Sequence, residues 1–205
     1  MEKKYKLTEE TINVNGKTLH RIEALRDFGD VKKGNKGGFI EKENNLSQSG
    51  DCWVYGNARV YDNAVVYGDA SVYSYAQVYD NAVVYGTARV FGNAWVFCNA
   101  SIYGDASICN NAEVYGYAYV YGNAEIYGNA EIASNSDYIL FKNWWSSGRY
   151  FTWTKSNNMW KVGCFYGTGE ELIEKAYKDS EKSGREYEKI VKYVESILED
   201  NNADV

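Results

Sequence analysis

Histidine is almost absent from this chain, since His20 is the only one among 205 residues. A single imidazole excludes a zinc site built from several histidines. The four cysteines form neither a C-x-x-C pair nor a cluster with histidine, so they predict structural thiols rather than a disulfide framework or a metal centre. We therefore expect no metal and no cofactor.

Long apolar runs are also missing. The polar start at residues 1–6 is followed by no hydrophobic segment, and no later stretch is apolar enough to cross a bilayer. This pattern predicts a cytoplasmic protein without a membrane partner.

Positive charge is scarce in the middle of the chain. Between Asp51 and Asp137, nine acidic residues stand against Arg59 and Arg89, a local balance of −7 within a net charge of −6. A segment of this sign repels phosphates, so we expect no nucleic acid to bind it through its backbone.

The same segment has a strict six-residue period. An alanine follows four positions after each aliphatic residue of the series except the last, and Gly-Asn or Asp-Asn pairs, which are typical of turns, lie between them. Side chains alternate along an extended segment, so Ala58 and Val60 point to one side while Arg59 and Tyr61 point to the other. A short strand and a corner repeated in this way predict a parallel solenoid. The aliphatic positions are Val54, Val60, Val66, Val72, Val78, Val84, Val90, Val96, Ile102, Ile108, Val114, Val120, Ile126 and Ile132.

The unit V-Y-G-N-A-x resembles the repeat of the hexapeptide-repeat, left-handed parallel β-helix superfamily. The resemblance implies a mainly β fold with three hexads in each coil, so that residues eighteen apart lie above one another. It also implies the left hand, which spacing alone does not give, and trimers as a known form of assembly.

Two capping regions are expected around a solenoid of residues 51–137, because a stack of strands needs its open ends covered. Residues 1–50 predict an N-terminal cap, with a hairpin that turns at Asn15-Gly16 and an irregular first coil in which Gly37-Gly38 forms a tight structural turn. Residues 138–205 predict a small α+β module. It would contain a strand at 138–141, a hairpin of 150–154 and 159–165, a helix after a Thr168–Glu171 capping box, and a helix after Gly184.

Motifs in both caps are similar to those of a group of uncharacterised bacterial and prophage proteins built on this repeat. The motifs are G-G-F-I-E, N-L-S and C-W-V-Y-G-N-A near the start and G-C-F-Y-G-T-G-E-E-L near the end. The resemblance implies the architecture and an origin on a mobile element, and it brings no established activity.

Many members of the hexapeptide superfamily are acyltransferases, which use a histidine as general base and commonly extrude a loop between coils. In this chain His20 lies outside the repeat, and the repeat runs without an insertion. We therefore expect a non-catalytic protein. An acyltransferase with His20 as its one possible base remains the alternative.

The eighteen-residue spacing sorts the outward residues into three faces, two of which carry charges. The third carries none, and a tyrosine-rich face of this kind is typical of an interface, although stacked rings also stabilise a solenoid by themselves. We expect it to be covered by the C-terminal helices, by a second copy in a dimer or trimer, or by a host protein. The residues of this face are Val65, Tyr67, Val83, Tyr85, Ser101, Tyr103, Tyr119 and Tyr121.

The C-terminal module is rich in aromatic residues around one arginine. Such a set could stack a small nucleotide, while ordinary packing of a hairpin on helices would use the same side chains. The candidate residues are Trp144, Trp145, Arg149, Trp153, Trp160 and Phe165.

These features together predict a binding protein of a phage or other mobile element that inhibits or sequesters a host protein or a nucleotide signal. An acidic rod that imitates DNA is a further alternative, although Asp105, Glu113 and Glu125 are scattered among neutral residues. The pairs Glu113/Glu131 and Asp62/Asp80 could share a proton or a cation, but their spacing follows from the repeat itself.

Overall fold

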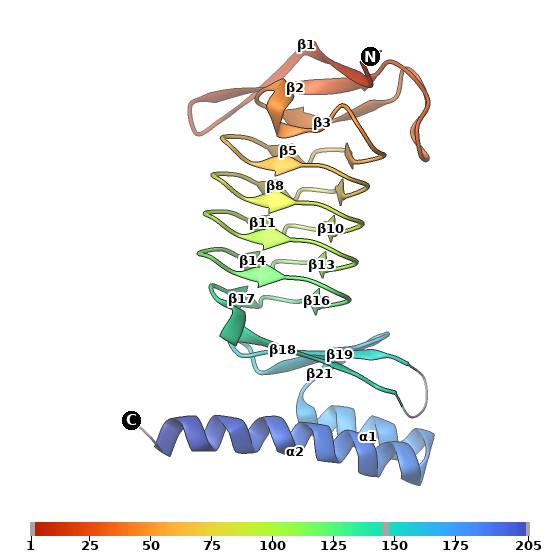
Figure 1. Cartoon of the computed structure of the whole chain (residues 1–205), viewed down its shortest axis with the longest axis vertical. Helices are drawn as coiled ribbons and strands as arrows, with labels where there is room; N and C mark the ends of the chain where they lie inside the picture. The colour runs from red at the N-terminus through yellow and green to blue at the C-terminus, as the bar shows by residue number, and fades with distance from the viewer. Residues whose placement is uncertain (1–2, 145–147, 204–205) are drawn as a thin grey trace.

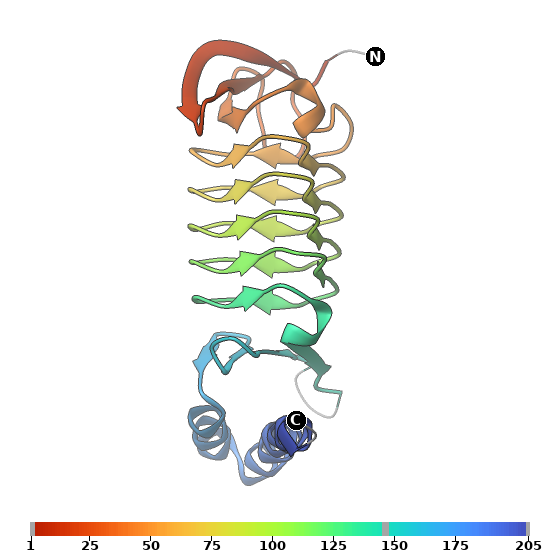
Figure 2. The same cartoon turned by 90° about the vertical axis from the view of Figure 1, so that its left-hand side faces the viewer.

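The computed structural model describes residues 3–144 and 148–203 and confirms a mainly β protein built around a parallel β-solenoid. The solenoid forms the middle of an elongated molecule, with the N-terminal strands at one end and a small sheet and two helices at the other (Figure 1, Figure 2). The N-terminal strands and the C-terminal module therefore lie at opposite ends of the solenoid.

Fourteen two-residue strands form the sides of the solenoid and hydrogen-bond into three parallel sheets. Paired strands are eighteen residues apart, as in Arg59 with Gln77 and Ser101 with Tyr119, which confirms three hexads per coil. The first sheet contains β5 (Arg59–Val60), β8 (Gln77–Val78), β11 (Trp95–Val96), β14 (Glu113–Val114) and β17 (Glu131–Ile132). The second contains β4 (Trp53–Val54), β7 (Ser71–Val72), β10 (Arg89–Val90), β13 (Ser107–Ile108) and β16 (Glu125–Ile126). The third contains β6 (Val65–Val66), β9 (Val83–Val84), β12 (Ser101–Ile102) and β15 (Tyr119–Val120).

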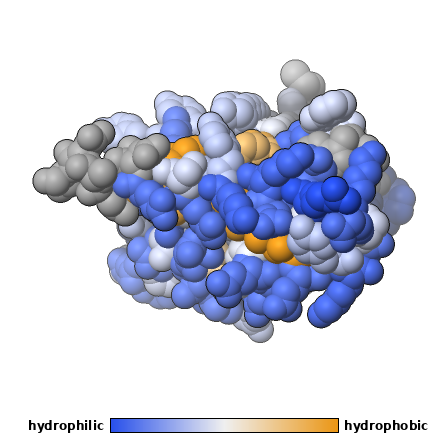
Figure 3. Space-filling view, turned by 90° about the horizontal axis from the view of Figure 1, so that it is seen from below, coloured by the Kyte–Doolittle hydropathy of each residue, from blue (hydrophilic) through white to orange (hydrophobic). Residues whose placement is uncertain are grey.

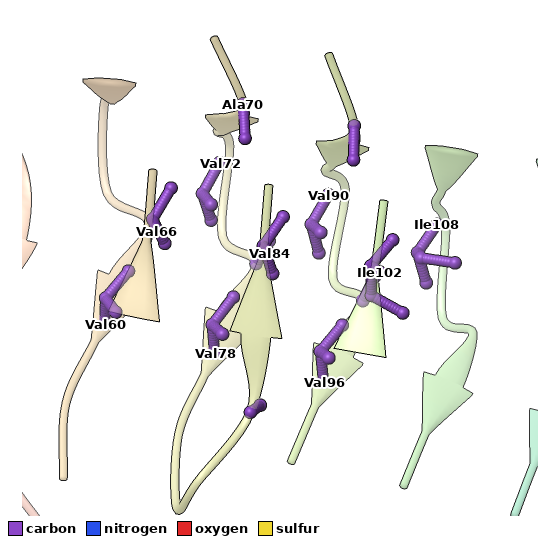
Figure 4. Close-up of a cluster of buried hydrophobic side chains, with 14 of the residues drawn as sticks. Val60, Val66, Ala70, Val72, Val78, Val84, Val90, Val96, Ile102 and Ile108 are labelled. Carbon is purple, nitrogen blue, oxygen red and sulfur yellow. The ribbon is translucent and has the colours of Figure 1, made fainter. Parts of the chain in front are cut away.

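The interior of the solenoid is a column of valine, isoleucine and alanine side chains. Every aliphatic residue of the repeat and every alanine that follows one is fully buried. Figure 4 shows the layers, in which Val78, Val84 and Val90 point inward from the three sheets. Burial of one such side chain contributes about 1.5 to 3 kcal/mol before chain entropy is counted, so the six-residue period is the main determinant of this fold.

Left-handed backbone geometry makes each corner of the solenoid. The residue after the outward aromatic position has a positive φ at every corner from Gly56 to Gly128. At Gly86 φ is 70°, and a Cβ there would lie 3.0 Å from the Gly104 nitrogen in the next coil. Five corners use Asp62, Ser74, Asp80, Cys98 and Asn110 at the same position. The turn prediction for the Gly-Asn and Asp-Asn pairs is therefore confirmed.

The N-terminal cap extends the first sheet. The predicted hairpin is confirmed, because β1 (Tyr5–Val14) and β2 (Lys17–Ala24) pair antiparallel around Asn15 and Gly16, which both have positive φ. β2 also pairs antiparallel with β3 (Lys36–Ile40), and β3 pairs in parallel with β5. Antiparallel strands thus cover the edge that the first sheet would otherwise expose.

The first coil is longer than a coil of the repeat. Ile40 aligns with Val60 and Leu46 with Val66, twenty residues apart, and the 3-10 helix η1 (Glu43–Asn45) lies between them. The prediction of a tight turn at the glycine pair is wrong, because Gly37 and Gly38 lie within β3. A Cβ at Gly38 would come within 2.6 Å of the Ala58 carbonyl oxygen, so the pair allows β3 to approach the coil beneath it.

The C-terminal module has a hydrophobic core of its own. It contains Phe151, Trp153, Trp160, Leu172 and Val191, and it is separate from the column of the solenoid. The predicted strand and hairpin are confirmed, with a turn at 163–164 that divides the last segment in two. The elements are η2 (Asn135–Asp137), β18 (Tyr138–Lys142), β19 (Tyr150–Thr154), β20 (Met159–Val162), β21 (Phe165–Gly167), α1 (Gly169–Asp179) and α2 (Glu181–Ala203).

The two helices pack against each other at the end of the molecule. The Thr168 hydroxyl accepts a hydrogen bond from the Glu171 nitrogen and the Glu171 carboxylate accepts one from the Thr168 nitrogen, which confirms the capping box. The second helix begins at Glu181 rather than after Gly184, and Gly184 lies inside α2 where this helix approaches the Tyr177 ring. Seen from below, this end is mostly hydrophilic, with a narrow hydrophobic strip (Figure 3). No helix in the described residues is long and apolar enough to cross a bilayer.

Candidate interaction surface

The outer side of the third sheet is the candidate interaction surface, which we call the uncharged face. The register of β6, β9, β12 and β15 brings together all the residues that the sequence assigned to it. The first sheet instead exposes Glu113 and Glu131, and the second carries Arg89 and Glu125. The uncharged face consists of Val65, Tyr67, Val83, Tyr85, Ser101, Tyr103, Tyr119 and Tyr121.

A continuous stack of four tyrosine rings runs along one edge of this face. The ring centroids of Tyr67 and Tyr85 are 4.9 Å apart, those of Tyr85 and Tyr103 are 5.0 Å apart, and those of Tyr103 and Tyr121 are 5.4 Å apart. The planes differ by no more than 13°. Because each ring covers the face of the next, the stack presents ring edges and hydroxyl groups to a partner.

The central tyrosines of the stack remain neutral at physiological pH. The pKa of Tyr85 and that of Tyr103 are raised above the ordinary value, mainly by desolvation and to a smaller extent by the neighbouring tyrosines. A partner that covers this face would therefore meet hydroxyl donors and acceptors and apolar carbons, with no ionised group to desolvate.

The helices of the chain do not cover the uncharged face. They lie beyond the end of the solenoid in both views (Figure 1, Figure 2). The exposed fractions are 39% for Tyr67, 46% for Tyr119 and 47% for Tyr121. Helices folded back over this face were one of the three expected covers, and that expectation is wrong because α1 and α2 pack on the terminal sheet. A second copy and a foreign protein remain.

The faces of the other two sheets are partly covered by the N-terminal cap. Trp53 on the second sheet is buried beneath Phe28, with ring centroids 5.3 Å apart. On the first sheet, Tyr61 packs with Val14 and Leu19 of the hairpin. The uncharged face differs from its neighbours in charge, and among the described residues the cap meets it only near Val65, beside Glu43 and Leu46.

Two of the aromatic residues proposed to stack a nucleotide are core residues. Trp153 and Trp160 face each other across β19 and β20 and are 3% and 2% exposed, so packing is their role in this structure. Trp153 also donates a hydrogen bond from Nε1 to Oδ1 of Asn158 at 2.9 Å. Trp144 is 85% exposed, and Trp145 lies outside the described residues.

Arg149 and Phe165 line a cavity of about 330 Å³ between the terminal sheet and the helices. Sequence reasoning identified these two residues and missed the rest of the lining. Lys175, Asp179 and Tyr187 come from α1 and α2, and no local motif connects them to Arg149.

His20 is held in the hairpin away from the repeat. It is half-buried, and its Nδ1 lies 3.0 Å from the Thr8 carbonyl oxygen. Both carboxylates of the Asp62/Asp80 pair have partners within the chain. Asp80 accepts a hydrogen bond from the Cys98 nitrogen at 3.1 Å, and Asp62 forms an ion pair with Lys17. Within residues 3–144 and 148–203, no group of three or more potential metal ligands is present.

The four cysteines are free thiols. Cys52 and Cys109 are buried, Cys98 lies at a corner, and Cys164 is exposed. Cys164 was expected in a strand and instead lies in the turn between β20 and β21. Burial raises the pKa of Cys109 to about 12, so this thiol is protonated at neutral pH.

Comparison with known proteins agrees with the observed repeat. The family model described as YdcK Beta solenoid repeat matches residues 54–68, 58–74 and 76–88. This match supports a hexapeptide-repeat-like β-helix for the repeat segment. An Escherichia coli (strain K12) protein named uncharacterized acetyltransferase YdcK is 49% identical over 37 residues, which is 18% of this chain and 11% of that protein. The match therefore spans about a tenth of the length of that relative.

Proposed function

We propose that this protein is a non-catalytic binding protein that engages a protein partner through the uncharged face. The observation that carries the proposal is a stack of tyrosines on a sheet face that has no charge and that the helices of the chain do not cover. Tyrosine buries a large area with little loss of conformational entropy, and it is enriched where interfaces draw their binding energy.

The biological setting we infer is that of a phage or mobile-element protein that inhibits or sequesters a host protein or a nucleotide signal. The motifs of the two caps support this setting through their similarity to prophage proteins. The relative named acetyltransferase matches too little of either chain to oppose it.

A second copy of the chain is the partner that the uncharged face suits directly. In a two-fold interface each patch meets itself, so any charged residue near the axis faces a like charge. A dimer through the first sheet would bring Glu113 and Glu131 close to the same residues of the second copy, and these like charges would repel. A dimer through the uncharged face has no such repulsion. A dimer through this face follows from the chemistry, and a trimer follows from the superfamily resemblance.

The test of this interface introduces charge into its centre. The double variant Tyr85→Asp, Tyr103→Asp should lower the molar mass measured by light scattering, because two carboxylates per copy would be desolvated in the contact. Trp95→Asp is the matched control, since Trp95 is similarly exposed on the first sheet. A folded double variant of unchanged mass, judged by circular dichroism and thermal unfolding, would reject self-association through this face.

Capture of a host protein needs a separate experiment with the same variants. Wild-type protein immobilised through its C-terminus should retain a host protein that the double variant loses and Trp95→Asp keeps. If all three forms retain the same proteins, the uncharged face is not the docking site.

An acyltransferase is the alternative from a different functional class. The name of the Escherichia coli relative favours it, while the position of His20 in the hairpin and the unbroken repeat oppose it. An acyltransferase should bind acyl-CoA and lose activity in His20→Ala, and a binding protein should do neither. The DNA-mimic alternative requires a regular lattice of carboxylates, and three of the five coils of the first sheet carry Arg59, Gln77 and Trp95 in place of an acidic residue.

A further inference from the structure

We propose that the cavity in the C-terminal module binds a small anion that carries an aromatic ring and a hydrogen-bond donor, a ligand of the size and chemistry of a nucleoside monophosphate. This inference rests on the part of the proposed function in which the protein binds a nucleotide signal, and it names the cavity as the binding site. The cavity is distinct from the uncharged face, so the two can fail separately.

The cavity has a rigid apolar wall. Val162 of β20 and Leu172 and Ala176 of α1 are almost completely buried where they line it, and Tyr187 of α2 closes one side. Its volume of about 330 Å³ lies at the small end of the range of ligand pockets in proteins. Buried side chains in a packed core hold their positions, so the site is formed before a ligand arrives.

Three charged side chains line the cavity around this wall. Arg149 and Lys175 supply two positive charges and Asp179 one negative charge, in a protein whose net charge is −6. Neither Lys175 nor Asp179 forms an ion pair among the side chains that the structure describes. The balance is positive, which is opposite in sign to the whole molecule and favours an anionic group.

Each lining group matches one part of the proposed ligand. Guanidinium and ammonium groups bind a phosphate through charge-assisted hydrogen bonds. The partly exposed Phe165 offers a ring surface to an aromatic group, while the largely buried Tyr187 contributes only its edge of the lining. The Asp179 carboxylate only accepts hydrogen bonds when ionised, so it selects a ligand with an amine or hydroxyl donor.

The local backbone explains why Arg149 lies at this cavity. Gly163 has a φ of 55°, and a Cβ at this residue would lie 3.6 Å from Cδ of Arg149. The arginine stem therefore runs beside the turn that connects β20 to β21. The same turn carries Cys164, an exposed thiol in the lining, which reports on the site.

Protection of Cys164 from alkylation is the test of occupancy. Iodoacetamide labelling is followed by peptide mass spectrometry of the full chain, in the presence of adenosine monophosphate, adenosine or inorganic phosphate. We expect adenosine monophosphate to slow labelling of Cys164 several-fold and to leave Cys98 unchanged, and we expect the two fragments to protect less. Absence of protection by millimolar adenosine monophosphate overturns the proposal. Equal protection by phosphate alone overturns the aromatic part of it.

A matched pair of lysine variants tests the chemistry. Lys175→Gln should weaken binding of adenosine monophosphate roughly tenfold by isothermal titration calorimetry, because one charge-assisted hydrogen bond is lost. Lys178→Gln, on the same helix and outside the cavity lining, should leave the affinity unchanged. Equal affinities of the two variants would contradict the site. Loss of the uncharged-face interaction alone would leave both results intact.

Discussion

The ammonium group of Lys4 lies 3.2 Å from Sγ of Cys52 and donates a 2.9 Å hydrogen bond to the Cys52 carbonyl oxygen. Both residues are fully buried. The ammonium also contacts the carbonyl oxygens of Ser49 and Gly50 and lies over the Phe28 ring, 5.1 Å from its centroid. This lysine therefore ties the first strand to the extended loop of the first coil.

Replacement of Lys4 should destabilise the N-terminal cap. Lys4→Met leaves several buried carbonyl oxygens without a donor, and we expect the free energy of unfolding to fall by about 3 kcal/mol in urea titrations. Lys3→Met is the control, because the Lys3–Glu43 ion pair is on the surface and such pairs contribute about 0 to 1 kcal/mol. Equal effects of the two substitutions would show that the buried ammonium group is not a determinant of stability.

Alkaline pH should unfold the protein through its buried tyrosines. Burial raises the pKa of Tyr138 to about 12 from the ordinary value of 10.0. A group whose pKa is raised by folding stabilises the native state below its unfolded pKa, and this contribution is lost as the pH rises through the folded value. We therefore expect the urea midpoint to fall between pH 10 and 12.

The variant Tyr138→Phe separates this effect from other titrations. It loses the hydrogen bond from the Tyr138 hydroxyl to the Tyr119 carbonyl oxygen, so it should be less stable at neutral pH. Its stability should nevertheless decline less steeply above pH 10. Tyr117→Phe, at a ring that is 75% exposed, is the matched control. A decline as steep as that of the wild type would mean that Tyr138 is not responsible.

Two glycine substitutions, one in the hairpin turn and one at a corner of the solenoid, separate the cost of a positive φ from the cost of a close contact between coils. Gly16 and Gly86 both have positive φ, so alanine costs about 1 kcal/mol at either. A Cβ at Gly16 meets nothing within 4 Å, whereas a Cβ at Gly86 lies 3.0 Å from the Gly104 nitrogen. Gly86→Ala should therefore lower the free energy of unfolding by at least 1 kcal/mol more than Gly16→Ala. Similar losses in denaturant titrations would show that the coils separate easily.

The solenoid was predictable because one short pattern is repeated without interruption. The spacing between Tyr85 and Tyr103 specifies that they are neighbours, and the ring stack follows from it. The hairpin at Asn15-Gly16 and the capping box at Thr168 were predictable because each depends on adjacent residues.

Contacts between segments without a period were not predictable. Lys4 meets Cys52 only because the start of β1 packs on the first coil. Lys175 and Arg149 line the same cavity only through the packing of α1 on the terminal sheet. The aromatic composition of the C-terminal module suggested stacking on a ligand. Cross-strand burial of Trp153 against Trp160 instead places those rings in its core.

The position of α2 against α1 can be tested at Gly184. In an exposed helix interior, alanine is about 0.5 to 1 kcal/mol more favourable than glycine. A Cβ at Gly184 would lie 2.2 Å from the Tyr177 ring, so Gly184→Ala should instead destabilise the protein by about 1 to 3 kcal/mol. Lys182→Ala, at an exposed position of α2, is the control and should change little. Thermal unfolding measures both variants, and a gain in stability for Gly184→Ala would mean that the two helices do not pack at this site.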